Sequence, residues 1–214
     1  MQLLRDRTDS GSSRLCLLHQ QWGPTQQSHP AKIMNIREKA QVMNAADIER
    51  AVNRLAYEII ERNRGTSNLA LVGIRRRGVP LADRLAHCIS DREKSQVPVG
   101  YLDINLYRDD LSTVATQPVI QRTEINFPIS DKIIVLVDDV LYTGRTIRAA
   151  MDALLDYGRP KGIQLCVLVD RGLRELPIEA NFIGKFFQTT EDEMVEVRLR
   201  EIDQIDRVLL VEKN

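Results

Sequence analysis

The sequence has few cysteines, few aromatic residues and no long apolar run, and each shortage excludes a class of protein. Its three cysteines lie far apart in 214 residues and form no CxxC pair. This excludes a disulfide scaffold and a cysteine-ligated zinc site, and it favours a cytoplasmic protein. Without a run of about 18 apolar residues, we expect no membrane span. Aromatic residues make up only 5%, too few for an extended platform that stacks single-stranded nucleic acid.

An excess of charge of one sign is also lacking. The 30 basic and 30 acidic residues balance to a formal net charge of zero. Four basic and two acidic residues lie in 1–33, so residues 34–214 hold 26 basic and 28 acidic ones and carry −2. A general attraction to nucleic-acid phosphates is therefore excluded, and any such contact has to come from a local basic patch.

What is present fits one globular domain behind an N-terminal extension. Hydrophobic residues make up 43% of the chain, enough to build a core. Residues 1–33 are rich in Ser, Gln and Arg and have no helical or strand periodicity, so we interpret them as a disordered extension. A transit peptide is the alternative for this segment. Residues 34–214 form the domain, and Met34 is a candidate natural start.

Apolar strands alternate with amphipathic helices, which predicts an α/β fold with a mainly parallel twisted sheet flanked by helices. Continuous apolar runs predict buried strands at 69–74, 133–138 and 163–170. Helical spacing predicts helices from Asn44 to Gly65 and over 81–89 and 145–158. A strand at 97–107, a mobile loop at 108–118 and a returning strand at 119–125 predict a flexible β-hairpin. Two further strands are expected at 195–202 and 207–212.

Four polar segments follow predicted strands. Because ligands bind at the carboxyl ends of parallel strands, we expect these segments to converge on one crevice: 75–78, 107–110, 138–146 and 170–175.

The stretch IIVLVDDVLYTGRT carries the clearest chemistry. An apolar strand ends in Asp138 and Asp139, and Thr143, Gly144 and Thr146 open a helix. Successive N–H groups at a helix N-terminus bind phosphate, and adjacent carboxylates suit ribose hydroxyls or a hydrated magnesium ion. The chain has no GxxxxGK[ST] and no GxGxxG, which excludes a P-loop and a dinucleotide fingerprint.

This stretch resembles the phosphoribosyl-pyrophosphate (PRPP) motif of type I phosphoribosyltransferases. With LYRDDL and LVDRGLRELPI, the chain from Met34 onward is similar to the PyrR family of bifunctional pyrimidine-operon regulators and uracil phosphoribosyltransferases. The resemblance implies a type I phosphoribosyltransferase fold with a small base-binding hood. It implies that uracil and PRPP react to give UMP and pyrophosphate, with Mg²⁺ held mainly by PRPP near Asp138 and Asp139 and no protein ligand assigned to it.

The resemblance also implies roles for individual residues. Asp138, Asp139 and Arg108 would be catalytic. The PRPP-binding residues would be Val137, Asp138, Asp139, Val140, Leu141, Tyr142, Thr143, Gly144, Arg145 and Thr146. The pyrophosphate loop would be Arg75, Arg76, Arg77 and Gly78, the flexible loop would begin at Tyr107, Arg108 and Asp109, and the base would contact the segment that starts at Asp170 and Arg171.

A second implied function is UMP-responsive binding of pyrimidine-operon leader RNA, which controls transcription by attenuation. The candidate RNA-binding residues are Arg50, Arg54, Tyr57, Arg62 and Lys185. Tyr57 and Leu173 stand where relatives carry histidines, and Glu179 replaces an expected basic residue, which weakens this function relative to catalysis. The resemblance further implies a homodimer or homotetramer. Two alternatives stay open: a purine-salvage phosphoribosyltransferase, and an RNA regulator that uses the PRPP site only to sense nucleotides.

Overall fold

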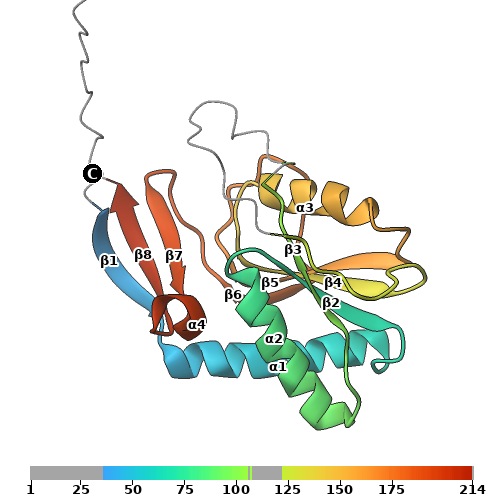
Figure 1. Cartoon of the computed structure of the whole chain (residues 1–214). Helices are drawn as coiled ribbons and strands as arrows, with labels where there is room; N and C mark the ends of the chain where they lie inside the picture. Colours follow the sequence, from blue (N-terminus) through green and yellow to red (C-terminus); the bar gives the residue numbers. More distant parts are fainter. Residues whose placement is uncertain (1–35, 106, 108–121, 214) are drawn as a thin grey trace, which may run out of the picture. The chain divides into compact units, whose positions relative to one another are not determined.

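The computed structural model describes residues 36–105, 107 and 122–213, which form two sheets and four helices (Figure 1). The larger sheet has the order β3-β2-β4-β5-β6, and all its neighbouring strands are parallel. Its strands are β2 (Leu69–Ile74), β3 (Val99–Leu102), β4 (Ile133–Leu141), β5 (Gly162–Asp170) and β6 (Phe182–Phe186). The predicted α/β class and parallel sheet are confirmed.

The smaller sheet is antiparallel and joins the two ends of the described chain. It has the order β1-β8-β7 and is built from β1 (Ile36–Met43), β7 (Glu193–Arg198) and β8 (Arg207–Lys213). The short helix α4 (Arg200–Asp203) connects β7 to β8. We refer to β1, β7, β8 and α4 as the hood.

The first long helix begins at the predicted cap. In α1 (Ala45–Asn63) the Asn44 side chain accepts a hydrogen bond from the N–H of Asp47 at 2.9 Å, and the Asp47 carboxylate accepts one from the N–H of Asn44 at 3.0 Å. This reciprocal capping satisfies two N–H groups that the helix leaves without intrahelical partners. The helix ends where Arg64 adopts a left-handed conformation with φ of 55°.

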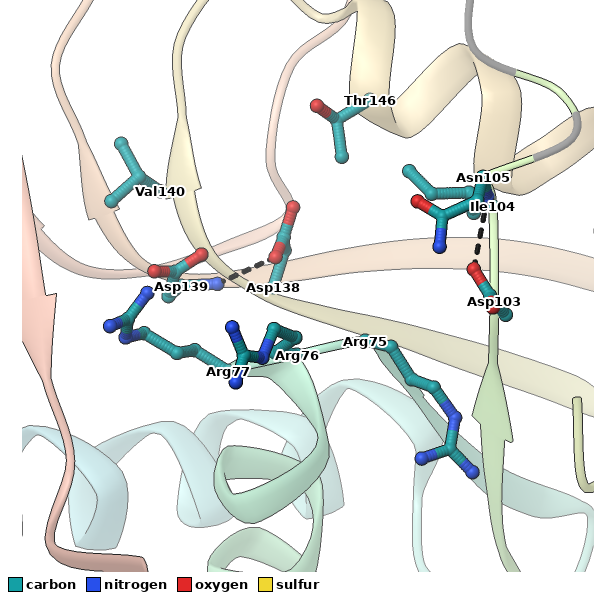
Figure 2. Close-up of a pocket in the computed structure, with 10 residues that line it drawn as sticks. All are labelled: Arg75, Arg76, Arg77, Asp103, Ile104, Asn105, Asp138, Asp139, Val140 and Thr146. Atoms are coloured by element: carbon teal, nitrogen blue, oxygen red, sulfur yellow. Dashed lines mark hydrogen bonds between the residues drawn. The ribbon is translucent and has the colours of Figure 1, made fainter. Parts of the chain in front are cut away.

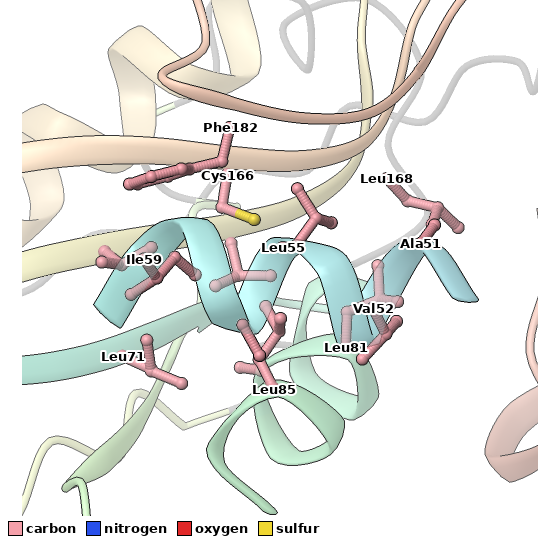
Figure 3. Close-up of a cluster of buried hydrophobic side chains, with 14 of the residues drawn as sticks. Ala51, Val52, Leu55, Ile59, Leu71, Leu81, Leu85, Cys166, Leu168 and Phe182 are labelled. Carbon is pink, nitrogen blue, oxygen red and sulfur yellow. The ribbon is translucent and has the colours of Figure 1, made fainter. Parts of the chain in front are cut away.

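Helices cover both faces of the parallel sheet, and a separate apolar cluster lies on each face (Figure 1). One cluster packs α1 and α2 (Gly78–Glu93) against the sheet, with Leu55, Ile59 and Leu85 at most 2% exposed (Figure 3). The other packs α3 (Arg145–Leu155) through Ile147, Ala150 and Leu154. Because β2, β4 and β5 are buried on both faces, their sequences are continuous apolar runs.

Several predicted element bounds were wrong. The strand predicted at 97–107 is only β3, because Asp103 and Asn105 turn the chain through a hydrogen bond from the Asn105 N–H to the Asp103 carboxylate. Residues 195–202 do not form one strand, since β7 stops at Arg198 and α4 follows. Within the predicted returning strand, the described residues contribute one antiparallel bridge, between Tyr101 and Glu124.

The strands β1 and β6 were not predicted at all. The predicted ranges 81–89 and 133–138 were shorter than the observed α2 and β4. β1 is largely exposed and β6 is short, so neither carries a continuous apolar run. Segment 1–33 and the loop 108–118 lie outside the described residues. In the part of the chain that the structure describes, no helix is both long and apolar enough to cross a membrane.

Candidate active site

A cavity of about 600 Å³ opens at the carboxyl ends of β2, β3 and β4 (Figure 2). Three separate segments line it: the predicted pyrophosphate loop, the acidic end of β4, and residues 103–105 after β3. Its lining residues are Arg75, Arg76, Arg77, Asp103, Ile104, Asn105, Asp138, Asp139, Val140 and Thr146. Of the four segments expected to converge, 75–78 and 138–146 supply lining residues, whereas no described residue of 107–110 or 170–175 lines this cavity.

The two adjacent carboxylates differ in their surroundings. Asp138 is only 6% exposed, and its Oδ1 accepts a hydrogen bond from the N–H of Asp139 at 2.9 Å. Burial raises the pKa of Asp139 above the ordinary range of a carboxyl, while hydrogen bonding with Asp138 and the charge of Arg77 oppose that rise. The Asp138 carboxylate can therefore accept hydrogen bonds, and a polar or cationic ligand bound beside Asp139 would favour the ionised form of that carboxyl.

The turn between β4 and α3 forms a second hollow of about 290 Å³, lined by residues 140–147. Gly144 opens α3 with φ of 92°, a conformation that side-chain-bearing residues rarely adopt. The N–H of Arg148 forms the first intrahelical bond, to the Gly144 carbonyl, and the Arg145 N–H donates to the Thr143 hydroxyl at 3.3 Å, so the N–H groups of Thr146 and Ile147 have no intrahelical partner. A helix N-terminus exposed in this way favours an anionic group such as phosphate.

The side chains of the three consecutive arginines have different partners. The Arg75 guanidinium donates to Glu124 at 2.8 Å and lies 5.8 Å from the centre of the Tyr101 ring. Arg77 pairs with Asp203 of α4 through two hydrogen bonds. Arg76 is exposed, and no hydrogen bond, ion pair or ring contact among the described residues involves it.

Two glycines let the arginine loop approach the sheet closely. A Cβ on Gly78 would lie 2.3 Å from the Val137 carbonyl oxygen and 3.3 Å from the Asp138 Cα. A Cβ on Gly73 would lie 2.6 Å from the Gly78 carbonyl oxygen. The loop is thereby seated against the backbone that carries the acidic pair, although Gly78 itself does not line the cavity.

Residues 103–105 form a wall of the cavity that the sequence did not reveal. Asp103 Oδ1 accepts the Asn105 N–H at 2.9 Å, whereas Asp103 Oδ2 is buried and has no hydrogen-bond partner in the described structure. The run LDINLY continues the alternating pattern of a strand, but its Asp103 and Asn105 are residues that favour turns and could have indicated that the strand ends here.

The predicted base segment packs beneath the β4–α3 turn through its own side chains. Arg174 donates to the Asp170 carboxylate at 2.5 Å and to the carbonyls of Tyr142, Gly172 and Ile178 at 2.9–3.1 Å. This arginine holds the two ligand-binding segments together, and the sequence did not single it out.

The Arg171 side chain is also directed into the protein. It donates to the Thr189 hydroxyl and the Thr190 carbonyl, and its guanidinium lies 4.0 Å from the centre of the Tyr142 ring. Burial lowers the pKa of Arg171. The side chains of Asp170 and Arg171 therefore both bind protein groups.

Among the other expected PRPP-binding residues, Leu141, Tyr142, Thr143 and Arg145 line the second hollow, whereas Val137 is buried and lines neither hollow. Tyr107 donates its hydroxyl to Asp156 just beyond α3, whereas Arg108 and Asp109 lie outside the described residues. The exposed Arg145 side chain pairs with Glu175 at 2.7 Å. Across the described ranges, no three His, Cys, Asp or Glu side chains group closely enough to hold a metal ion.

Three of the five candidate RNA residues, Arg50, Arg54 and Lys185, lie close together, and the two arginines are paired with carboxylates. Arg50 pairs with Asp47 at 2.6 Å, and Arg54 pairs with Glu58 at 2.5 Å while it also donates to two carbonyls of β6. A hollow of about 290 Å³ brings these two arginines beside Lys185.

The two other residues predicted for this patch use side-chain groups within the protein. Arg62 lies over the Phe182 ring at 5.8 Å, and Arg92 lies over the Tyr57 ring, 3.1 Å from its centre. One face of Tyr57 is therefore occupied, and only the opposite face can stack on a nucleobase.

Comparison with known proteins agrees with this geometry. Residues 39–197 match the family model of the phosphoribosyl transferase domain. The bifunctional protein PyrR of Pelotomaculum thermopropionicum is 62% identical over 176 residues, which cover 82% of this chain and 97% of that protein. The bifunctional protein PyrR of Deinococcus radiodurans is 57% identical over 172 residues, covering 80% and 94%.

Solved structures support the fold. A hypoxanthine phosphoribosyltransferase from Staphylococcus aureus superposes with a TM-score of 0.59 at 21% identity, covering 80% of this chain and 92% of that one. At this identity the likeness concerns architecture alone. The domain match and the high identity over most of the chain agree with each other, and this protein belongs to the PyrR family of phosphoribosyltransferases.

Proposed function

We propose that the protein converts uracil and PRPP into UMP and pyrophosphate in the cavity between β2, β3 and β4. One observation carries this proposal: the turn that opens α3, the acidic pair and the arginine loop line two hollows at the carboxyl ends of the strands, and both hollows share Val140 and Thr146. A ribose with a phosphate at one end and pyrophosphate at the other requires these three kinds of group in this order. The curated relatives bear the name PyrR, which favours uracil over a purine.

The turn that opens α3 would bind the 5′-phosphate. Its N–H groups and the Thr143 and Thr146 hydroxyls can donate to phosphate oxygens, and the left-handed Gly144 gives the backbone the bend that exposes them. Asp138 and Asp139 would accept hydrogen bonds from the ribose hydroxyls and hold the ring while the anomeric carbon reacts. Such fixed positioning of the reacting groups supplies much of the catalysis in this kind of transfer.

In the reaction, a uracil ring nitrogen bonds to the anomeric carbon as the bond from that carbon to pyrophosphate breaks, and the proton of that nitrogen is released to pyrophosphate or to solvent. The transition state resembles an oxocarbenium ion, and negative charge develops on the leaving group. Arg76 is the candidate that binds this charge directly, because it is exposed and lines the cavity, whereas Arg75 and Arg77 are paired with carboxylates. A guanidinium can donate two parallel hydrogen bonds to phosphate oxygens.

The cavity also fits the Mg²⁺ that PRPP carries. Magnesium prefers oxygen ligands and keeps much of its water shell. Three carboxylates line the cavity, and the buried Asp103 Oδ2 lacks a hydrogen-bond partner among the described residues, so it can accept from a metal-bound water. When bound, the ion would neutralise charge on pyrophosphate, while Asp138 and Asp139 keep the ribose in place.

The roles of the flexible loop and of the base segment remain proposals. Arg108 would close over PRPP and keep water from the reactive ribosyl centre. Uracil would contact the backbone that follows Asp170, because the side chains of Asp170 and Arg171 bind protein groups. A homo-oligomer, a dimer or a tetramer, is proposed from the family alone.

A second function, UMP-responsive binding of RNA, is favoured by the basic patch on α1 and β6 and by the word bifunctional in the relatives' names. Most charges of this patch are paired with carboxylates or carbonyls. Binding should therefore depend on RNA shape and sequence more than on general phosphate attraction.

The test compares uracil with hypoxanthine as the base that the protein converts. The protein is incubated with PRPP, Mg²⁺ and either uracil or hypoxanthine, and nucleotides are separated by chromatography. We expect UMP from uracil and no product from hypoxanthine. Conversion of hypoxanthine would support the purine-salvage alternative. Binding of PRPP without conversion of either base would support a regulator that only senses nucleotides.

A further inference from the structure

We propose that Asp203, in the hood helix α4, is a positioning residue that orients Arg77 and through it the pyrophosphate loop. The inference rests on the proposed PRPP chemistry, but it concerns a residue outside the cavity and 126 positions away from Arg77 in the sequence. Asp203 does not line the cavity, whereas Arg77 does.

The contact between the two side chains is two-pronged. Arg77 Nε donates to Asp203 Oδ2 at 3.1 Å, and Nη2 donates to Oδ1 at 2.9 Å. The arginine side chain is 31% exposed and the aspartate 20%, so solvent screens the pair only in part. Hydrogen bonding from Arg77 lowers the pKa of Asp203, and the same bond raises the pKa of Arg77. A planar guanidinium held at two points has a fixed plane as well as a fixed position.

Asp203 is itself held by its own helical turn. Its Oδ2 accepts the N–H of Leu199 at 3.0 Å, and its N–H is bonded to the Leu199 carbonyl. The carboxylate is therefore a fixed acceptor. It belongs to the segment that joins β7 to β8, so the hood determines where the arginine fork lies.

Other carboxylates also act on Arg77. Besides the bond to Asp203, the negative charges of Asp139 and, more weakly, Glu196 stabilise its guanidinium. The pair with Asp203 uses two of the five N–H groups of the Arg77 guanidinium. The other three belong to the same planar group, so Asp203 fixes their direction as well. Removing the charge of Asp203 would leave Asp139 as the stronger attraction, and Arg77 would reorient toward the ribose-binding acid and away from the position set by the hood.

A neighbouring ion cluster offers a matched control. Seven residues after Arg77, within α2, Arg84 donates to Glu201 at 2.8 and 2.7 Å and to Asp206 at 2.7 Å. This cluster joins the same hood segment to the helix that follows Arg77, but Arg84 does not line the cavity. If docking of the hood were all that mattered, breaking either pair would have the same effect.

The experiment compares Asp203→Asn, Asp203→Glu and Glu201→Gln in the full-length protein. Steady-state kinetics give kcat, KM for PRPP and the inhibition constant of pyrophosphate, and calorimetry gives the affinities for PRPP with Mg²⁺ and for UMP. We expect Asp203→Asn to raise KM for PRPP and the inhibition constant of pyrophosphate about tenfold, since a misplaced positioning group weakens binding of the group it serves. UMP lacks pyrophosphate, so its affinity should change less than about twofold, the scatter allowed for an uninvolved group.

Two further outcomes make the assignment specific. Asp203→Glu keeps the carboxylate and should recover most of the pyrophosphate affinity, whereas Glu201→Gln should lower the melting temperature and leave that affinity unchanged. The proposal is overturned if Asp203→Asn binds pyrophosphate like the wild type, or if Glu201→Gln weakens it equally. Should Asp203→Asn not fold, Arg77→Lys carries the test, because lysine keeps the charge and loses the fork. Calorimetry measures PRPP affinity without turnover. An inactive wild type would therefore refute the uracil reaction, while the PRPP affinities of wild type and variants would still test the role of Asp203.

Discussion

Replacement of Gly78 by alanine should damage the site from a position that makes no polar contact with substrate. The new methyl group would lie 2.3 Å from the Val137 carbonyl oxygen, against an ordinary contact of 3.4 Å or more. The arginine loop and the acidic end of β4 would therefore have to separate by about 1 Å. A displacement of about 1 Å can cost about a hundredfold in rate, and overpacking of this kind costs about 1–3 kcal/mol of stability.

The assay for Gly78→Ala pairs kinetics with thermal unfolding. We expect kcat/KM for PRPP to fall about a hundredfold and the melting temperature to fall about 2–4 °C for each kcal/mol lost. Gly162→Ala is the control, since a Cβ at Gly162 meets nothing within 4 Å. Wild-type kcat/KM in Gly78→Ala would refute the claim that close packing of the loop on β4 forms the site.

Three other predictions follow from the same structure. Asp139→Asn should lower turnover at least tenfold yet raise stability, because burial raises the pKa of Asp139 and its ionised form therefore destabilises the folded state by an amount that is absent at low pH and grows as the pH rises through that pKa. The melting temperature of Asp139→Asn should exceed that of the wild type by a margin that increases with pH, and equal melting temperatures at all pH values would contradict this. A chain that starts at Met34 should keep its melting temperature and its uracil activity, and loss of folding would show that residues 1–33 contribute to the fold. A pyrimidine-leader hairpin should bind more tightly with UMP, with a log–log salt slope no steeper than about −4, and tight binding insensitive to sequence and UMP would refute the patch of Arg50, Arg54 and Lys185.

The sequence predicted the central strands and the acidic motif well because both obey local rules. β2 and β5 are buried on both faces, so burial makes them continuous apolar runs whose bounds nearly coincide with the prediction. The Asn44 cap and the glycine that opens α3 follow from backbone chemistry that depends on a few neighbouring residues.

What the sequence could not predict depends on contacts between distant segments. β1 pairs with β8 across almost the whole chain, and its exposed surface leaves no apolar pattern to detect. Three adjacent arginines look equivalent in sequence, yet Glu124 and Asp203 bind two of them and leave Arg76 as the candidate for pyrophosphate. Arg174 likewise acquires its role only because acceptors from two segments, 170–178 and the β4–α3 turn, surround it.

The most direct test of the account compares wild type with Arg76→Ala in one assay of UMP and pyrophosphate formation from uracil, PRPP and Mg²⁺. Arg76 is exposed and forms no hydrogen bond, ion pair or ring contact with another described side chain, so its removal should leave the melting temperature unchanged. We predict equal amounts of UMP and pyrophosphate from the wild type, and a kcat/KM for PRPP at least about tenfold lower in the variant, as expected when a charged hydrogen bond to the leaving group is lost. No UMP from the wild type, or the same kcat/KM in both proteins, would contradict the account.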